Sequence, residues 1–440
     1  MSYVSFDEPI DCNIRRFSNL ASVVMPDTIA SSPALKNTRI KRGDFSNVDI
    51  DEARRRARAM IPFLKEHAAA QEAQTYMTEP VKNAFHESGL FRYMQPKYWG
   101  GMELPYVAMV DLNDILAQGD ASAAWTFTNL GGHHRLLSLW PMECQEEVWG
   151  DDPDVGIASG IAYFQGRGRR VDGGLEVSGK WGFSSGVDVS EWNMLACVVY
   201  DGEGDKAKPV DWCMSMIPRK DYEIVDDWQT LGMRGTGSRT VRCEKVFVPK
   251  HRFVSMAVAL PGHEFPGLRV HKNPIYRVPL SGFGGYGIAG VMIGNAQGAL
   301  DDTIAHVKAR STAYTGASMR DFQAVQYRVA LAAGKIDCAR HWLRHDCNEA
   351  MDVVNSGGTF TVLDRMRYRR NSAMAAKLAT EAIDTLHEMM GANGIYDHAP
   401  LQRRFRDAHA AGGHIHFSMD AQLPSYGLVA MGGEFKSPTF

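Results

Sequence analysis

The side chains best suited to chemistry lie near the end of the chain, in the segment 400–416. A helix that starts at Leu401 ends at Gly412-Gly413, because paired glycines favour a helix stop. The stop comes directly before the last two of three histidines, His409, His414 and His416. Imidazole titrates near neutral pH, so a helix end that carries it suits proton transfer. A solvated basic helix end is the alternative from this segment alone.

A second pair, His133-His134, lies in the very apolar segment 121–139, which we expect to be a buried helix. Neighbouring residues on a helix point to different sides, so only one of the two imidazoles can face a pocket. A buried core histidine is the alternative for either. The segment has neither HxxxH spacing nor a nearby carboxylate, so we predict no metal site.

Composition limits the class of protein. The chain has 440 residues, is 45% hydrophobic and 22% charged, and carries a net charge of -3, as soluble globular proteins do. This charge predicts no binding to nucleic acid or to a membrane. The seven cysteines include no CxxC pair, which favours reduced thiols. The first residues lack a signal-peptide pattern. We therefore expect a cytoplasmic protein.

The pattern of the chain changes twice, which predicts an α+β fold that is mostly α. We expect an extension over 1–45, a helical domain over 46–150, a β-domain over 151–262, a substrate-pocket loop over 263–282 and a helical bundle over 283–440. In the β-domain, Asp172-Gly173-Gly174 predicts a hairpin turn. Many short strands between glycine turns indicate a small barrel or sandwich.

This order of domains, together with three strings, resembles the acyl-CoA dehydrogenase superfamily of flavoproteins. The strings begin at Trp181 (WGFSSGV), Trp228 (WQTLGMRGTGSRT) and Gly391 (GANGIY). They look like the strand that meets the flavin ring, the segment that closes the β-domain and the end of the C-terminal bundle. The resemblance covers about residues 45–430. It implies a helical domain, a central β-barrel or sandwich, and a C-terminal four-helix bundle.

Within the superfamily, the string from Phe405 to His416 resembles the group D oxygenases of two-component flavin-dependent monooxygenases, most of all the oxygenase component of p-hydroxyphenylacetate hydroxylase. The resemblance implies reduced flavin, FMNH2 or FADH2, delivered by a separate NAD(P)H-flavin reductase. It also implies a homotetramer that hydroxylates a phenolic or indolic substrate with O2 through a C4a-hydroperoxyflavin. Two departures are His416, where the phenol enzyme has tyrosine, and the loop 260–279, which differs.

Two other functions compete with this one. An acyl-CoA dehydrogenase or oxidase would need a carboxylate base over the flavin, and the segment 412–416 has none. A non-enzymatic helical scaffold would leave His133 and His414 without a function. No GxGxxG follows a predicted strand, so we expect NAD(P)H to bind the partner reductase.

The resemblance assigns roles to single residues. The expected catalytic residues are His414 as the base, His133 in the substrate pocket, and Ser185 as acceptor from the flavin N5–H. Substrate contacts are expected from His416, Ser159 and Arg277. Flavin contacts are expected from Ser184, Ser185, Trp181, Phe183, Arg310, Thr312, Tyr314, Gly391 and Gly394. Ordinary alternatives are a turn for the serines and glycines, core packing for Trp181 and Phe183, and an exposed helix end for Arg310.

Overall fold

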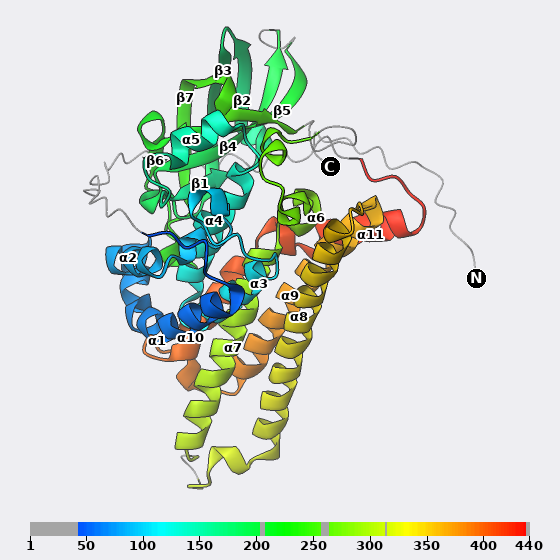
Figure 1. Cartoon of the computed structure of the whole chain (residues 1–440). Helices are drawn as coiled ribbons and strands as arrows, with labels where there is room; N and C mark the ends of the chain where they lie inside the picture. Colours follow the sequence, from blue (N-terminus) through cyan, green and yellow to red (C-terminus); the bar gives the residue numbers. More distant parts are fainter. Residues whose placement is uncertain (1–42, 203–206, 257–263, 313–314, 437–440) are drawn as a thin grey trace. The chain divides into compact units, whose positions relative to one another are not determined.

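The structure is a computed structural model that describes residues 43–202, 207–256, 264–312 and 315–436. Most of the expected extension, part of the expected pocket loop, and Tyr314 lie outside these ranges. Helices lie on both sides of a central β-region in sequence, and they form a long bundle below the sheet in Figure 1. The expected mostly helical α+β architecture is confirmed.

The first helices are α1 (Ile50–Gln74), α2 (Glu79–Ser88), α3 (Ala108–Ala117), α4 (Ala121–Leu137) and α5 (Met142–Trp149). The carboxylate of Asp49 caps α1 by accepting the N–H of Glu52 at 2.8 Å. Asp120 caps α4 in the same way, through the N–H of Ser122. Nearly every residue of α4 is buried, so this helix runs through the core. The sequence did not predict α5.

The strands form one sheet in the order β6-β7-β3-β2-β4-β5-β8, and β1 pairs with β4 outside this path. Their bounds are β1 (Ile157–Gly160), β2 (Gly166–Val171), β3 (Gly174–Ser184), β4 (Trp192–Asp201), β5 (Lys208–Pro218), β6 (Glu223–Val225), β7 (Arg239–Pro249) and β8 (Phe253–Ser255). The predicted hairpin joins β2 to β3, and Gly173 supplies the positive φ of +77° that its turn requires.

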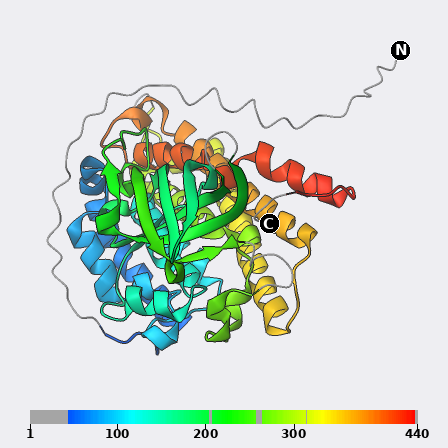
Figure 2. The same ribbon diagram turned by 90° about the horizontal axis from the view of Figure 1, so that it is seen from above.

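The second helical region comprises α6 (Leu280–Phe283), α7 (Tyr286–Ala309), α8 (Gln323–Asn355), α9 (Val362–Glu388), α10 (Pro400–Gly412) and α11 (Met419–Ala430). Helices α7, α8, α9 and α10 pack on one another as the expected bundle. The helix α11, which was not predicted, packs against α9 and reaches out from the bundle in Figure 2.

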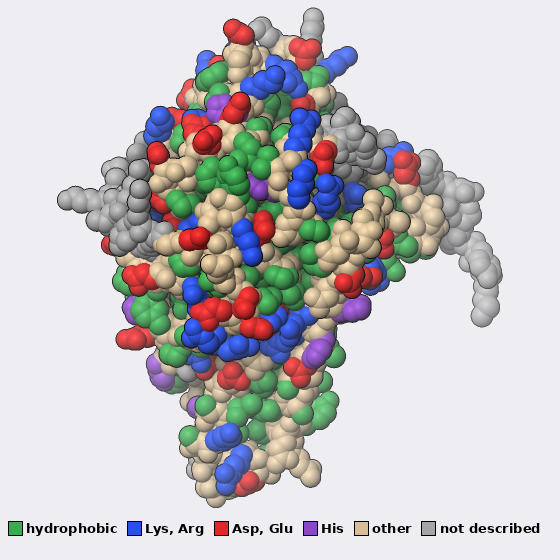
Figure 3. Space-filling model, viewed as in Figure 1, with side chains coloured by type: hydrophobic (Ala, Val, Ile, Leu, Met, Phe, Trp, Pro, Cys, Tyr) green, Lys and Arg blue, Asp and Glu red, His purple; other side chains and the backbone are tan. Residues whose placement is uncertain are grey.

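Helix α4 joins the β-domain to the helical bundle, because it packs against both β1 and α7. The approach to α7 is close: a Cβ on Gly287 would lie 2.2 Å from the Thr128 hydroxyl oxygen. On the face shown in Figure 3, acidic and basic side chains are interspersed. Among the described residues, no helix has an apolar stretch long enough to cross a bilayer.

Candidate active site

His133 lies on α4 and its half-buried imidazole is fixed by β1. The ring Nδ1 is 2.7 Å from the carbonyl oxygen of Ile157, which can only accept, so Nδ1 carries a proton and donates it. Burial lowers the pKa of His133 to about 4. The ring is therefore neutral at neutral pH. Its Nε2 is left with a lone pair and can accept a proton.

His134 is the core histidine that the sequence left as an alternative. Its ring is almost fully buried and stacks on Trp149 with centroids 5.6 Å apart. The Trp149 indole N–H donates to His134 Nδ1 at 3.0 Å. Of the adjacent pair, His134 supports the fold and His133 is available for the site.

His414 and His416 follow α10 in a short 3-10 turn, and their rings stack with centroids 5.3 Å apart. The backbone N–H of His416 donates to His414 Nδ1 at 3.2 Å. Burial lowers the pKa of His414 to about 4, so the ring is neutral and its proton is on Nε2. This tautomer is a donor at Nε2, which argues against the expected role of His414 as the base and favours His133.

His416 lies against the start of the bundle. A Cβ on Gly284 would be 3.0 Å from Cε1 and Nε2 of the His416 ring, so a larger residue there would press on the imidazole. Burial, together with the nearby His414 and Arg369, lowers the pKa of His416 to about 3. His416 is therefore a neutral side chain at the junction of α6 and α7.

Ser185 and His414 meet at Trp125 on α4. The indole N–H of Trp125 donates to Ser185 Oγ at 3.1 Å, and the indole ring meets the His414 ring edge to face at 5.7 Å. Ser185 Oγ is also 2.7 Å from Ser238 Oγ. The sequence did not single out Trp125 or Ser238, although Ser238 lies within the string WQTLGMRGTGSRT.

Two expected flavin contacts are corrected by burial. Ser184 is fully buried and its hydroxyl accepts from the Asn193 amide at 2.9 Å. Trp181 is also fully buried, and its indole N–H donates to the carbonyl of Ala196 at 2.7 Å. Strict alternation would turn these two side chains to opposite faces of β3, but an irregularity in the strand pairing between Trp181 and Ser184 turns both into the domain core, away from a cofactor. Phe183 points the other way and is 75% exposed, with a φ of +62°.

Of the other two expected substrate contacts, Ser159 lies near His133 and Arg277 does not. Ser159 lies on β1, two residues after the Ile157 carbonyl that holds His133, and is half-buried. Arg277 lies on the surface, where its guanidinium pairs with Glu264 at 3.2 Å. An exposed, paired arginine does not fit the expected position beside the reacting oxygen. This expectation is not supported, because the side chain at 277 turns away from the core.

The segment before α6 is held by buried groups that the sequence did not indicate. Arg135, two residues after His133, donates to the carbonyls of Ile275 and Val278. Glu103 accepts from the Tyr276 hydroxyl at 2.8 Å and from the Asn273 amide at 3.0 Å. Glu103 has a φ of +50°, which is rare for a residue with a side chain. These contacts fix the segment 273–278 against α4.

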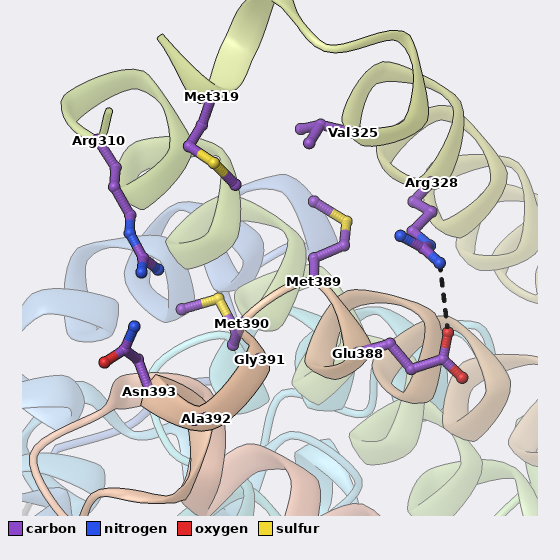
Figure 4. Close-up of a pocket in the computed structure, with 10 residues that line it drawn as sticks. All are labelled: Arg310, Met319, Val325, Arg328, Glu388, Met389, Met390, Gly391, Ala392 and Asn393. Atoms are coloured by element: carbon purple, nitrogen blue, oxygen red, sulfur yellow. Dashed lines mark ion pairs between the residues drawn. The ribbon is translucent and has the colours of Figure 1, made fainter. Parts of the chain in front are cut away.

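Arg310 and Gly391 are brought together at the end of the bundle where α7 terminates. They line a pocket of about 360 Å³ together with Met319, Val325, Arg328, Glu388, Met389, Met390, Ala392 and Asn393. In Figure 4 the Arg310 guanidinium and the Asn393 amide point toward one another. Thr312 lies just beyond Arg310 and its N–H donates to Ala317 O at 2.9 Å. Gly394 follows in the same 3-10 turn and is buried.

This pocket is far from His416 within one chain. His416 packs at Gly284, before the first residue of α7, and Arg310 directly follows its last. A helix of 24 residues is about 36 Å long at 1.5 Å per residue. Neither FMN nor FAD spans that distance. The structure thus does not bring the expected phosphate contact Arg310 to the expected substrate contact His416 of the same chain.

Comparison with known proteins identifies the family to which this fold belongs. The model of the acyl-CoA dehydrogenase C-terminal domain matches residues 286–419. The chain is 36% identical over 383 residues to the flavin-dependent monooxygenase oxygenase subunit HsaA of Rhodococcus jostii, covering 86% of this chain and 97% of that one. It is 32% identical to the FADH(2)-dependent resorcinol hydroxylase oxygenase component of a Rhizobium strain, over 79% and 86% of the two chains.

The p-hydroxyphenylacetate 3-hydroxylase oxygenase component of Acinetobacter baumannii is 28% identical, over 90% of this chain and 92% of that one. The crystal structure of 3-HSA hydroxylase from Rhodococcus sp. RHA1 superposes with a TM-score of 0.82 at 33% identity, covering 89% and 100% of the two chains. The fold and site thus define an acyl-CoA dehydrogenase-like flavoprotein. The chain belongs to the oxygenase components of two-component flavin-dependent monooxygenases.

The residues present fit a flavin. Ser185 offers a buried hydroxyl beside an indole, and Arg310 offers a guanidinium beside a glycine turn, a combination suited to phosphate. Among the described residues, no group of three His, Cys, Asp or Glu side chains is arranged to hold a metal ion.

Proposed function

We propose that this oxygenase hydroxylates a phenolic or indolic ring and that His133 is its proton acceptor. The observation that carries the proposal is the opposite protonation of two imidazoles. Hydrogen bonds at Nδ1 leave His133 Nε2 as an acceptor and His414 Nε2 as a donor. A ring hydroxyl or indole N–H can give its proton to the first, while the second donates to an oxygen that gains negative charge.

Reduced flavin, when bound, supplies the electrons that activate O2. The chain's own residues hold the aromatic substrate, move its proton and keep water away. Ser185, Trp125 and His414 form one contiguous group through the contacts described above. The names of the relatives support the substrate class, since they include a resorcinol hydroxylase and a p-hydroxyphenylacetate hydroxylase. The resorcinol enzyme's name also supports FADH2 as one candidate cofactor.

We also propose that each flavin is held by two copies of the chain. The separation of Arg310 from His416 along α7 requires a second copy if one flavin reaches both Arg310 and the histidine end of the site. Helix α8 offers a surface for that copy: Tyr327 is 67% exposed and Leu331, one turn on, is 37% exposed. They flank Arg328, which lines the pocket. This supports the homotetramer that the sequence predicts, and the oxygenase name of the relatives supports a separate reductase.

The test is to mix the protein with photoreduced FMN or FAD and then with oxygenated buffer that contains candidate phenols and indoles. Product and peroxide are measured together. We expect hydroxylated product with peroxide well below the amount of flavin consumed. Stoichiometric peroxide with every aromatic compound, together with reduction of bound flavin by acyl-CoA thioesters, would instead indicate a dehydrogenase or oxidase.

A further inference from the structure

Four buried groups form a chain of hydrogen bonds that ends at a backbone carbonyl. The Thr236 hydroxyl donates to the carbonyl of Met233 at 2.8 Å. Thr236 Oγ1 is 2.7 Å from Ser238 Oγ, and Ser238 Oγ is 2.7 Å from Ser185 Oγ. Trp125 completes the chain through its indole N–H. All four side chains are at most 7% exposed.

The direction of every hydrogen bond in this chain is determined by its two ends. A carbonyl can only accept and an indole N–H can only donate. The single hydroxyl proton of Thr236 is used on Met233, so Ser238 must donate to Thr236. The proton of Ser238 is then used, so Ser185 must donate to Ser238. Ser185 Oγ therefore gives away its proton and accepts one from Trp125, which leaves it one lone pair.

The backbone fixes the carbonyl at the end of the chain. Met233 has a φ of +53°, in the left-handed region, and its own N–H donates to the Asp407 carboxylate at 2.6 Å. The neighbouring Gly232 lies so close to α10 that a Cβ there would be 2.3 Å from the carbonyl oxygen of Arg406. The Met233 carbonyl itself also accepts from the Trp228 indole N–H and from the Thr236 backbone N–H, each at 3.2 Å, and these bonds hold it toward Thr236.

We propose that Thr236 and Ser238 are positioning residues that make the site selective for the redox state of its cofactor. The inference rests on the proposed function, which places the flavin ring at Ser185. Reduced flavin carries a proton at N5 and can donate it to the free lone pair of Ser185. Oxidised flavin has only a lone pair at N5, and Ser185 has no proton left to offer it. The hydrogen bonds among these hydroxyls thereby favour the binding of reduced flavin, which the reductase delivers, over the binding of oxidised flavin.

The experiment measures the dissociation constants of reduced flavin, under anaerobic conditions, and of oxidised flavin. Ser238→Ala frees the Ser185 hydroxyl to donate, so we expect the preference for reduced flavin to fall about tenfold, the value of one or two neutral hydrogen bonds. In Thr236→Val, Ser238 loses its acceptor and donates to Ser185 instead. The Ser185 hydroxyl is then free to donate to oxidised flavin, so the preference for reduced flavin also falls. Thr236→Ser keeps the hydroxyl and retains the wild-type ratio.

Ser190→Ala is the matched control. Its hydroxyl is also buried in the β-domain, but it donates to the carbonyl of Val187, away from this chain. We expect the wild-type ratio there. If the wild-type protein binds reduced flavin and neither Ser238→Ala nor Thr236→Val changes the ratio, the positioning role is wrong. If the wild-type protein binds no reduced flavin, the proposed function itself fails.

Discussion

The carboxylate of Asp407 on α10 accepts the backbone N–H of Met233 at 2.6 Å, which joins the helix before His414 to the loop before β7. Asp407 is buried, and burial raises its pKa to about 7, with Asp120 and Glu72 adding to the rise and Arg403 and the Met233 N–H opposing it. The folded protein therefore keeps a proton that the unfolded chain releases near pH 4.

This arrangement predicts that stability falls as the pH rises from about 4 through 7. Asp407→Asn keeps an oxygen acceptor for Met233 but cannot ionise. Relative to wild type, we expect the variant to gain about 2–4 kcal/mol in the free energy of unfolding between pH 5 and pH 8. Urea unfolding at both pH values measures it. An equal pH dependence in both proteins would show that Asp407 is not the titrating group.

Substitution by asparagine distinguishes the roles of His133 and His414, because the asparagine amide reaches the position of Nδ1 but has no group at the position of Nε2. In His133→Asn the amide N–H still donates to Ile157, but no acceptor remains at Nε2. We expect hydroxylation of a phenol to fall by about 10²–10³-fold, as loss of a general base does. His414→Asn keeps the acceptor for the His416 N–H and should lose less activity. A larger loss in His414→Asn would return the role of base to that residue.

Since burial lowers the pKa of His133 to about 4, the neutral base is present at all pH values above about 5. The acid limb of the pH profile of the single-turnover hydroxylation rate should therefore lie near pH 4, well below the ordinary histidine value of about 6.5. His414→Asn should keep this limb because it keeps His133. A limb near pH 6.5 in wild type would show a solvated imidazole.

The contact between α4 and α7 depends on Gly287. In Gly287→Ala the new methyl group meets the Thr128 hydroxyl, so we expect a loss of about 1–3 kcal/mol in unfolding free energy from overpacking. Gly427→Ala in α11 is the control, because no atom lies within 4 Å of a Cβ there. That change should be neutral or stabilising by up to about 1 kcal/mol. Thermal and urea unfolding distinguish the two.

Glu103 holds the segment 273–278 before α6 through Tyr276 and Asn273. Glu103→Gln keeps the shape but leaves one acceptor oxygen for two donors, so its NH2 group replaces the acceptor of either Tyr276 or Asn273, and the remaining bond loses its charged acceptor. We expect KM for the aromatic substrate to rise about three- to tenfold with kcat nearly unchanged. Arg277→Gln, on the exposed side of the same segment, should leave both constants close to wild type.

Much of the fold could be predicted from the sequence. The helix capped by Asp49, the hairpin at Asp172-Gly173 and the order of helices, sheet and bundle follow from local patterns that tertiary packing does not override. The site was harder. The resemblance indicated His133 and Ser185, but protonation depends on partners distant in sequence, such as Ile157 and Ser238.

The incorrect expectations have two causes. The string WGFSSGV contains Trp181 and Ser184 beside Ser185, and a string does not state which face of a strand is buried. Arg277 was placed by resemblance in a loop where the likeness is weak. Trp125 gave no signal, because a tryptophan in an apolar helix is ordinarily core; its contacts with Ser185 and His414 set it apart.

The length of α7 also has a consequence for how cofactor occupancy responds to dilution. If a flavin is held by His416 of one copy and Arg310 of another, as proposed, it keeps all its contacts only while the copies are associated. Its affinity then depends on protein concentration, and by reciprocity the flavin strengthens the association of the chains. At low concentration the protein would lose both together, so the reductase would find its acceptor only in the assembled form.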